Sequence, residues 1–492
     1  MGTMIQRQNL GAADFGGPDL EGCNENLVLS RPDVIERIHD EYLQAGADLI
    51  ETNTFGATPV VLAEYGLAAK AVEINRRAAE LARAACSKVG PGRFVAGSMG
   101  PTTRTITVTG GVTFDQLIDG YRLQAVGLLQ GGADLLLLET AQDTRNVKAG
   151  LLGIHRAFAE TGLEVPVSVS ATIEAMGTML AGQGIDALWA SLEHAGLLSV
   201  GLNCATGPAF MTDHLRTLSA MAPAFLTCYP NAGLPNTEGE YEESPAKLAS
   251  EIARFVEHGW VNAVGGCCGT TPEHIRELSK VARAGKPRVR PAVHRTHFSG
   301  IDYVPVAEDS RPVIVGERTN VLGSRKFKKL IAEGKHEEAA EIGRKQVLSG
   351  AQILDVCLQD PDRDETADMK LFLEKLIRRV KAPLMIDSTD AKVIEVALAY
   401  CQGKSILNSV NLEDGEERFK KVVPLAKAYG AALVVGCIDE QGQGVTTDRK
   451  AAIAERSYFL LTEKYGVAPE DILWDPLVFP CASGDKNYIG SA

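Results

Sequence analysis

Three cysteines stand where apolar runs give way to loops, and together they have the chemistry of metal ligands. Cys267 and Cys268 are adjacent and flanked by glycines, whereas Cys204 follows an apolar run that ends at Asn203. Neighbouring side chains of a strand point to opposite faces, so the adjacent pair shares one ion only if the backbone turns sharply, as glycine permits. Three thiolates without a fourth sulfur are the ligand count of a catalytic zinc. We therefore predict that these three cysteines bind Zn²⁺ and leave one position open for a substrate.

The cysteine content also has an interpretation without a metal. The chain has ten cysteines, and a buried cysteine often behaves as a small hydrophobic residue. Cysteines scattered over 492 residues do not resemble a disulfide framework. Free thiols, and hence a cytoplasmic protein, are expected under either interpretation.

Length and charge narrow the class of protein. A chain of 492 residues is too long for one ordinary domain, so we expect two or three. The net charge of −13, with no basic stripe to offset it, argues against nucleic acid or an anionic membrane surface as the partner. No segment has about 18 consecutive apolar residues, and the first residues lack the apolar core of a signal peptide.

In the first half, short apolar runs alternate with alanine-rich amphipathic segments, which predicts a parallel sheet covered by helices. Seven strands are expected, at 47–53, 93–97, 133–139, 165–170, 198–203, 225–228 and 262–264. An eight-stranded barrel needs one more. In such barrels the chemistry lies at the carboxyl ends of the strands. Asn53, Glu139, Cys204 and the cysteine pair all fall at those ends.

Residues 286–311 break this rhythm and are basic and rich in proline, so we interpret them as a linker. Six further strands are expected, at 312–316, 352–356, 383–387, 405–408, 432–436 and 471–475. The prediction is an α/β chain with two tandem (β/α)8 TIM-type barrels, the first lacking its first strand and the second its last two. The expected domains are 1–285 and 312–492.

Asp387, Asn408 and Asp475 each stand at the end of a strand in the second half. Taken singly, such a residue is often the N-cap of the next helix. Three of them at one barrel mouth favour a binding site instead. Carboxylates and an amide suit a ring that is rich in N–H donors, such as a pterin. The segment Gly323, Ser324 and Arg325 follows the first strand and is expected to close over that ligand.

Several motifs resemble known families. The first half resembles the homocysteine S-methyltransferase domain in the segments 51–57, 139–143, 201–204, 230–235 and 265–274. The second half resembles the pterin-binding domain that follows it in cobalamin-dependent methionine synthase, in the segments 316–327, 386–388 and 408–410. The resemblance covers nearly the whole chain, and the order of the two domains is itself specific.

The resemblance implies a role for each matching residue. The zinc ligands would be Cys204, Cys267 and Cys268, with Asn231 as a fourth, oxygen ligand that the substrate thiol displaces. Glu139 would bind the amino group of homocysteine. The residues that hold or line the pterin site would be Gly323, Ser324, Arg325, Asp387, Asn408 and Asp475. Asn408 or a bound water would help to place a proton on the folate.

The implied reaction is methyl transfer from 5-methyltetrahydrofolate, through cobalamin, to the zinc-bound thiolate of homocysteine, which gives methionine. The DxHxxG signature of a cobalamin-binding domain is absent from the sequence. Cobalamin is therefore expected as a partner brought by a downstream region or another chain. Two other interpretations remain open: a cobalamin-independent thiol methyltransferase, and an inactive fragment that binds zinc or folate.

Three departures from the family pattern bear on these expectations. The chain begins at Met1-Gly2-Thr3-Met4, where the family's first strand should already have ended, so the first barrel is expected to be open at a seam. Cys357 occupies a position where the family has asparagine, which affects any pterin contact there. The last two strands of the second barrel are missing. We expect a fragment or a misassigned start.

Overall fold

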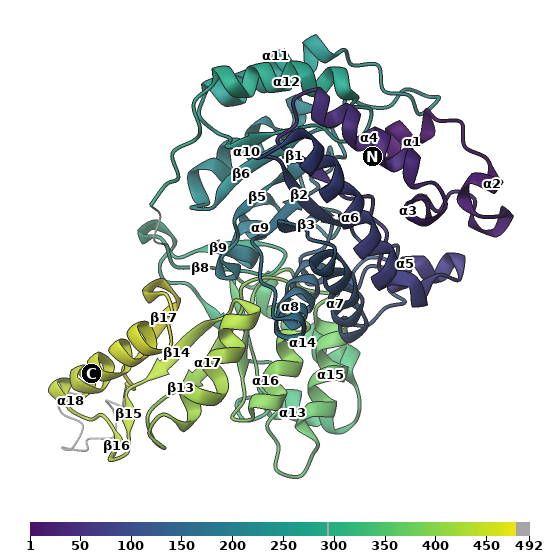
Figure 1. Cartoon of the computed structure of the whole chain (residues 1–492). Coiled ribbons are helices and arrows are strands. Elements are labelled where there is room, and N and C mark those ends of the chain that lie inside the picture. Colours follow the sequence, from purple (N-terminus) through teal and green to yellow (C-terminus); the bar gives the residue numbers. More distant parts are fainter. Residues whose placement is uncertain (293–294, 479–492) are drawn as a thin grey trace. The chain divides into compact units, whose positions relative to one another are not determined.

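The computed structural model describes residues 1–292 and 295–478, so residues 479–492 of the second expected domain lie outside the described part. The chain forms two compact units. The first contains the residues up to 292 except 190–194, and the second contains 190–194 and the residues from 295 onward. Each unit is built on its own parallel sheet, which curls into a half-barrel covered by helices (Figure 1).

The first unit has the seven parallel strands that the hydrophobic pattern predicts. They lie in chain order: β1 (Leu49–Glu51), β2 (Phe94–Met99), β3 (Leu135–Ala141), β4 (Val167–Ala171), β5 (Ser199–Asn203), β6 (Phe225–Tyr229) and β7 (Ala263–Val264). The principal helices that follow β1 to β7 are α6 (Ala71–Val89), α7 (Phe114–Gln130), α8 (Thr144–Thr161), α9 (Ile185–Leu192), α10 (Pro208–Met221), α11 (Pro245–Glu257) and α12 (Pro272–Ala284).

Strand alternation places several polar side chains inside this half-barrel. Gly97 faces helix α7, where an added Cβ would lie 2.9 Å from Leu128, and Cys228 faces Met211 of helix α10 at 3.9 Å between the sulfurs. Residues next to these outward positions point to the other side of the sheet. The inward set accordingly includes polar residues towards the carboxyl ends of the strands, among them Ser98, Glu139, Ser170, Asn203 and Tyr229.

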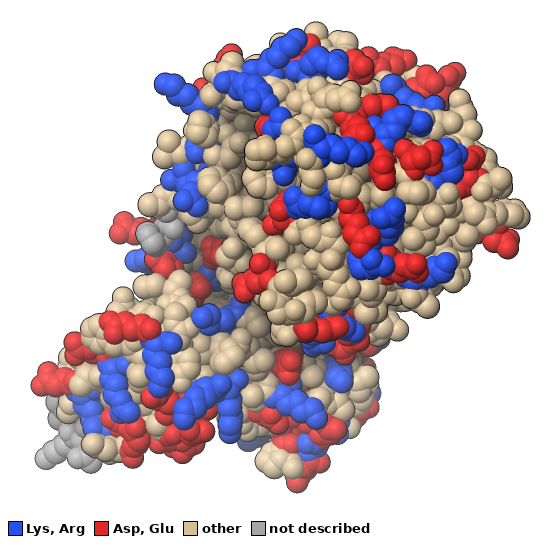
Figure 2. Space-filling view, viewed as in Figure 1, with Lys and Arg blue, Asp and Glu red and all other residues tan. Residues whose placement is uncertain are grey.

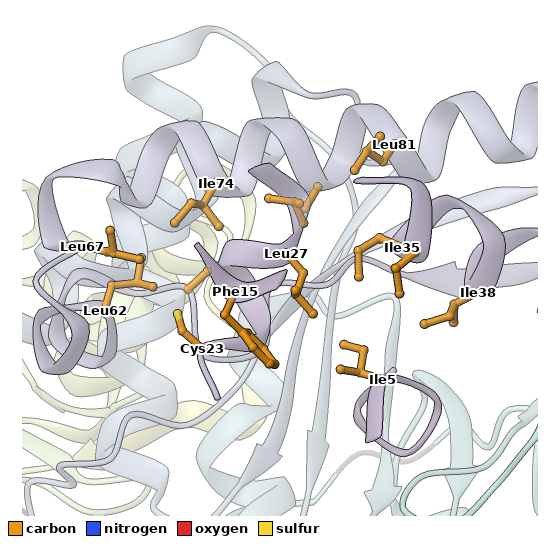
Figure 3. Packing of buried hydrophobic residues seen from close by; sticks show 14 of the residues in the cluster. Ile5, Phe15, Cys23, Leu27, Ile35, Ile38, Leu62, Leu67, Ile74 and Leu81 are labelled. Carbon is orange, nitrogen blue, oxygen red and sulfur yellow. The ribbon is translucent and has the colours of Figure 1, made fainter. Parts of the chain in front are cut away.

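The segment before β1 forms short helices rather than a strand: α1 (Gly2–Gln6), α2 (Ala12–Phe15), α3 (Leu27–Ser30) and α4 (Pro32–Gln44), with α5 (Pro59–Leu62) after β1. Their apolar side chains pack with Ile74 and Leu81 of α6 in one buried cluster (Figure 3). Two hydrogen bonds tie this segment to the loop after β7, from Tyr42 Oη to Thr270 O (3.0 Å) and from Gly269 N to Thr3 Oγ1 (3.0 Å). Helical segments therefore join the β7 side of the sheet to the β1 side.

The second unit has the expected six parallel strands: β10 (Val315–Gly316), β11 (Ile353–Val356), β12 (Leu384–Asp387), β13 (Ile406–Val410), β14 (Ala432–Gly436) and β17 (Ile472–Asp475). Its helices are α13 (Arg325–Ala332), α14 (His336–Leu348), α15 (Glu365–Leu376), α16 (Ala391–Leu398), α17 (Glu417–Tyr429) and α18 (Thr447–Phe459). A small hairpin, β15 (Ile438–Asp439) and β16 (Gly442–Gln443), follows β14.

Part of the stretch expected as a linker is built into the second unit. Residues 297–305 form a hairpin of β8 (His297–Ser299) and β9 (Tyr303–Pro305). Phe298 is 1% exposed and packs with Ile353, Ile406 and Ala432 at the starts of three strands. The side chain of Phe298 thus fills the amino-terminal end of the sheet, which is opposite to the end where chemistry is expected.

The charged side chains on the surface agree with the expectation from the sequence that no basic stripe offsets the net negative charge. Figure 2 shows basic and acidic side chains interspersed over the visible face, without a broad field of one sign. Every helix that the structure describes is too short or too polar to cross a bilayer.

Candidate functional site

The structure brings the three predicted cysteines together at the carboxyl end of the first sheet. The sulfurs of Cys204, Cys267 and Cys268 lie within 4.8 Å of one another, and all three residues are half-buried. The Cys204 and Cys268 sulfurs are 3.8 Å apart. A tetrahedral ion with Zn–S bonds of about 2.3 Å requires sulfurs about 3.8 Å apart, so the thiol spacing fits Zn²⁺.

An unusual backbone conformation directs Cys204 into the cluster. Strand β5 ends at Asn203, and the next two residues, Cys204 and Ala205, have φ values of 61° and 53°. This left-handed conformation is rare outside glycine and is held only where surrounding contacts require it. Here the Cys204 amide donates to Tyr229 O at 3.4 Å, and the Thr206 amide donates to Cys204 O at 2.6 Å.

The loop after β7 makes the turn that the glycines around the cysteine pair predict. Gly269 has a φ of 79°, and a Cβ there would lie 2.3 Å from Tyr241 Cβ. The Cys267 amide donates to Pro230 O at 2.8 Å, and the Thr270 hydroxyl donates back to Cys267 O at 2.7 Å. This tight turn places two consecutive cysteine sulfurs on the same side of the chain.

Asn231 contacts the cluster through the backbone of a cysteine. Asn231 Oδ1 accepts from the Cys268 amide at 3.0 Å, and Asn231 is 2% exposed. The Ala232 amide donates to Cys268 O at 2.9 Å. The oxygen that the resemblance assigns to the fourth metal position therefore holds the Cys268 peptide in place.

Hydrogen bonds among the three thiols shift the pKa values of Cys267 and Cys268 in opposite directions. Hydrogen bonds from Cys204 and Cys267 lower the pKa of Cys268 to about 3, and burial opposes this shift. The Cys267 thiol has a strongly raised pKa, because it donates to Cys204 and Cys268 and is buried. Binding of a metal cation by these thiols would release their remaining protons to the solvent.

Glu139 lies on the inward face of β3, at the same end of the sheet. It is 5% exposed, and the Ser98 hydroxyl donates to its carboxylate. Burial, followed by the neighbouring Glu51, raises the pKa of Glu139 to about 8. Cys268 is close enough to contribute to the same shift. A buried carboxylate near the sulfur cluster is a good partner for a cationic ligand group.

Replacing Glu139 with glutamine should flatten the fall in stability between acid and neutral pH. The folded pKa, about 8, lies above the usual value near 4.3, so the folded chain holds this proton more tightly than the unfolded chain does. The resulting stabilisation is complete below about pH 4 and is lost as the pH rises to 8. Between about pH 5 and pH 8, the melting temperature of the wild type should fall by a few degrees more than that of Glu139→Gln. If the melting temperatures of the two proteins change with pH in parallel, the raised pKa of Glu139 is wrong.

In the second unit, the structure joins two strand-end carboxylates through an amide that we did not predict. Asn320 Nδ2 donates to Asp355 Oδ2 at 3.0 Å and to Asp387 Oδ2 at 3.2 Å. Burial raises the pKa of Asp355 to about 6 and also raises that of Asp387. Asp355 is the second-last residue of a predicted strand, so attention to every strand end would have found it, whereas Asn320 lies in the 316–327 motif after a strand and carried no such signal.

The other predicted pterin residues have different surroundings. Asn408 lies beside Asp387 in the register of β12 and β13, and its side chain hydrogen-bonds to Asp355. Asp475 ends β17, where its carboxylate accepts from the Leu477 amide at 2.9 Å. Ser324 caps helix α13 by accepting from Phe327 N, and Arg325 is the first residue of that helix, directly after Gly323.

Two further residues shape this end of the second sheet. Cys357 is fully buried, and burial raises the pKa of its thiol to about 12. The protonated thiol hydrogen-bonds to Asp387. Arg418 of α17 donates to Ser388 O (2.7 Å), Thr389 O and Ser409 O (3.3 Å), which ties together the loop after β12 and the end of β13.

The fold and the three-thiol site define a class: parallel α/β barrels with a cysteine cluster at the mouth. The family model described as homocysteine S-methyltransferase matches residues 1–282, and the model described as pterin binding enzyme matches residues 316–489. The chain belongs to the homocysteine S-methyltransferase family. It is a methyltransferase-type chain in which a pterin-binding domain follows the homocysteine domain.

Similar solved structures include the homocysteine methyltransferase MmuM from Escherichia coli. Its metallated form is 23% identical, with a TM-score of 0.47, over 57% of this chain and 93% of that one. Its oxidized form is 22% identical, with a TM-score of 0.46, over the same shares. The 3-hexulose-6-phosphate synthase from Salmonella typhimurium is 16% identical, with a TM-score of 0.28, over 50% of this chain and 92% of that one.

Proposed function

We propose that this chain methylates the sulfur of homocysteine at a zinc ion held by Cys204, Cys267 and Cys268. The observation that carries the proposal is the approach of the three sulfurs to within 4.8 Å, with the Cys204 and Cys268 sulfurs at tetrahedral spacing. Zn²⁺ bound there would hold the substrate sulfur as a thiolate at neutral pH, where a free thiol is mostly protonated.

Residues of this chain would position the substrate. Once ionised, the Glu139 carboxylate would receive the substrate ammonium, and the charge of that group would offset the burial that now raises the pKa of Glu139. Asn231, Tyr42 and Thr3 would keep the loop of the cysteine pair in place through their hydrogen bonds to Cys268 N, Thr270 O and Gly269 N.

The second barrel would bind 5-methyltetrahydrofolate as the methyl source, with cobalamin as a carrier supplied from outside this chain. Support comes from the match to the pterin-binding model and from the polar group of Asn320, Asp355, Asp387 and Asn408. Their carboxylates and amides complement the N–H donors of a pterin ring. A proton is needed at the methyl-bearing nitrogen, and Asn408 is the residue we propose to help place it. The further proposed contacts are Gly323, Ser324, Arg325 and Asp475.

The test is methionine formation from homocysteine and free methylcobalamin, with and without a zinc chelator. We expect turnover that stops when zinc is removed and resumes when zinc is added back. Binding of radiolabelled 5-methyltetrahydrofolate tests the second barrel, because a cobalamin-independent thiol methyltransferase does not need that ligand. Absence of turnover in protein that holds one zinc per chain would contradict the proposed activity.

A further inference from the structure

Asn203 has a buried side-chain amide beside the thiol cluster, and each hydrogen-bonding group of that amide has a partner. It is the last residue of β5 and is 0% exposed. Its Oδ1 accepts from the Thr140 amide at 3.0 Å and from the Ser170 hydroxyl at 2.6 Å. Its Nδ2 donates to Thr140 Oγ1 at 2.8 Å and points at the sulfur of Cys267, 3.8 Å away.

These bonds allow only one orientation of the amide. The Thr140 backbone N–H is a donor whatever the state of its neighbours, so the atom that faces it must be the Asn203 oxygen. The NH₂ group therefore faces the Cys267 sulfur. Thr140 itself has a φ of 55°, next to Glu139, so the Asn203 side chain also holds an unusual backbone conformation beside that carboxylate.

The position of Asn203 links parts of the site that are far apart in sequence. Its own backbone continues into Cys204, while its side chain reaches β3, β4 and the loop after β7 that carries Cys267. We infer that Asn203 is a positioning residue that fixes the Cys267 sulfur relative to Cys204 and Glu139 and, by donating to that sulfur, makes it a weaker nucleophile than the substrate thiolate. The inference rests on the proposed zinc chemistry.

The physical reason is the effect of an N–H donor on a metal-bound thiolate. Groups that hydrogen-bond to metal ligands orient them and tune their basicity, and losing one typically lowers metal affinity by about 10- to 100-fold. A donor to sulfur stabilises the sulfur lone pair. Charge transfer from that sulfur to a bound Co²⁺ ion therefore needs more energy while the donor is present.

The experiment compares Asn203→Asp and Asn203→Ser with the wild-type full chain. Asp retains the oxygen that accepts from Thr140 and Ser170 but loses the NH₂ group, whereas the small Ser side chain cannot reach the sulfur. The control is Asn75→Ser, because Asn75 is also 0% exposed, in α6, and donates to Ala57 O and Ala71 O, both at 2.8 Å. Two readouts are used: zinc affinity by competition with a chromogenic chelator, and the sulfur-to-cobalt charge-transfer band.

We expect both Asn203 variants to bind zinc about 10- to 100-fold more weakly and to shift the cobalt band to longer wavelength, while Asn75→Ser matches the wild type. Folded Asn203 variants with unchanged zinc affinity and an unchanged cobalt band would overturn this inference but not the proposed function. Equal changes in Asn75→Ser would overturn it too, since they would reveal general destabilisation. A wild-type chain that holds no zinc would overturn both the proposed function and this inference.

Discussion

Replacing Cys204 with alanine should leave a folded chain that neither retains zinc nor methylates homocysteine. The apparent binding free energy of Zn²⁺ at structural sites is about 10–16 kcal/mol, shared among the ligands. The loss of one thiolate therefore removes roughly 3 kcal/mol, which corresponds to about a 100-fold loss of affinity or more. The remaining sulfurs of Cys267 and Cys268 also lose their proton-sharing partner. Metal analysis after gel filtration, together with the methylcobalamin assay, measures both effects.

Cys228 provides the matched control for that experiment. It is fully buried on the neighbouring strand β6, but its thiol faces Met211 of helix α10 rather than the cluster. Cys228→Ala should therefore lose some stability through the cavity it creates and should keep its zinc and its activity. Full zinc content with normal turnover in Cys204→Ala would refute the ligand assignment.

Replacing Asp387 with alanine should weaken binding of 5-methyltetrahydrofolate without affecting chemistry in the first barrel. Hydrogen bonds to a charged group contribute about 1.5–3 kcal/mol each, so we expect affinity to fall on the order of 10- to 100-fold. The substitution also removes the shared acceptor of Asn320 and Cys357. Titration with the radiolabelled folate measures binding, and the rate with free methylcobalamin measures the first barrel.

The control is Asp368→Ala in the same unit. Asp368 is also buried, but both of its carboxylate oxygens pair with Arg363, at 2.6 and 2.7 Å. This variant should lose stability and keep its folate affinity. If the two variants weaken folate binding equally, Asp387 has no specific role. If Asp387→Ala slows transfer from methylcobalamin, the two barrels do not act as separate modules.

Strand ends were the most reliable sequence signal. The apolar runs predicted all thirteen strands of the two large parallel sheets, and the residue at the end of each strand predicted where polar chemistry would gather. Cys204, Cys267 and Cys268 were found in this way because parallel strands bring their carboxyl ends to one edge. The structure supports their proximity and leaves their role as ligands to experiment.

Residues that act through side-chain contacts from other elements escaped this rule. Asn320 was quoted within a motif but not assigned to the site, and Arg418 lies on a helix, where spacing alone does not distinguish it from a surface arginine. Asn203 does end a predicted strand, but nothing in the sequence shows that its amide faces Cys267. Its importance depends on the register that sets β3, β4 and the loop after β7 around it.

The sequence by itself determined the repeated strand–helix order, the two parallel sheets and the end of each sheet where polar residues collect, because these depend on local hydrophobic period and chain direction. Only the tertiary structure decided that Gly269 contacts Thr3, that the amide of Asn203 faces Cys267, and that Phe298 fills the base of the second sheet. Such contacts join residues distant in sequence. They depend on sheet register and helix packing, which no local pattern encodes.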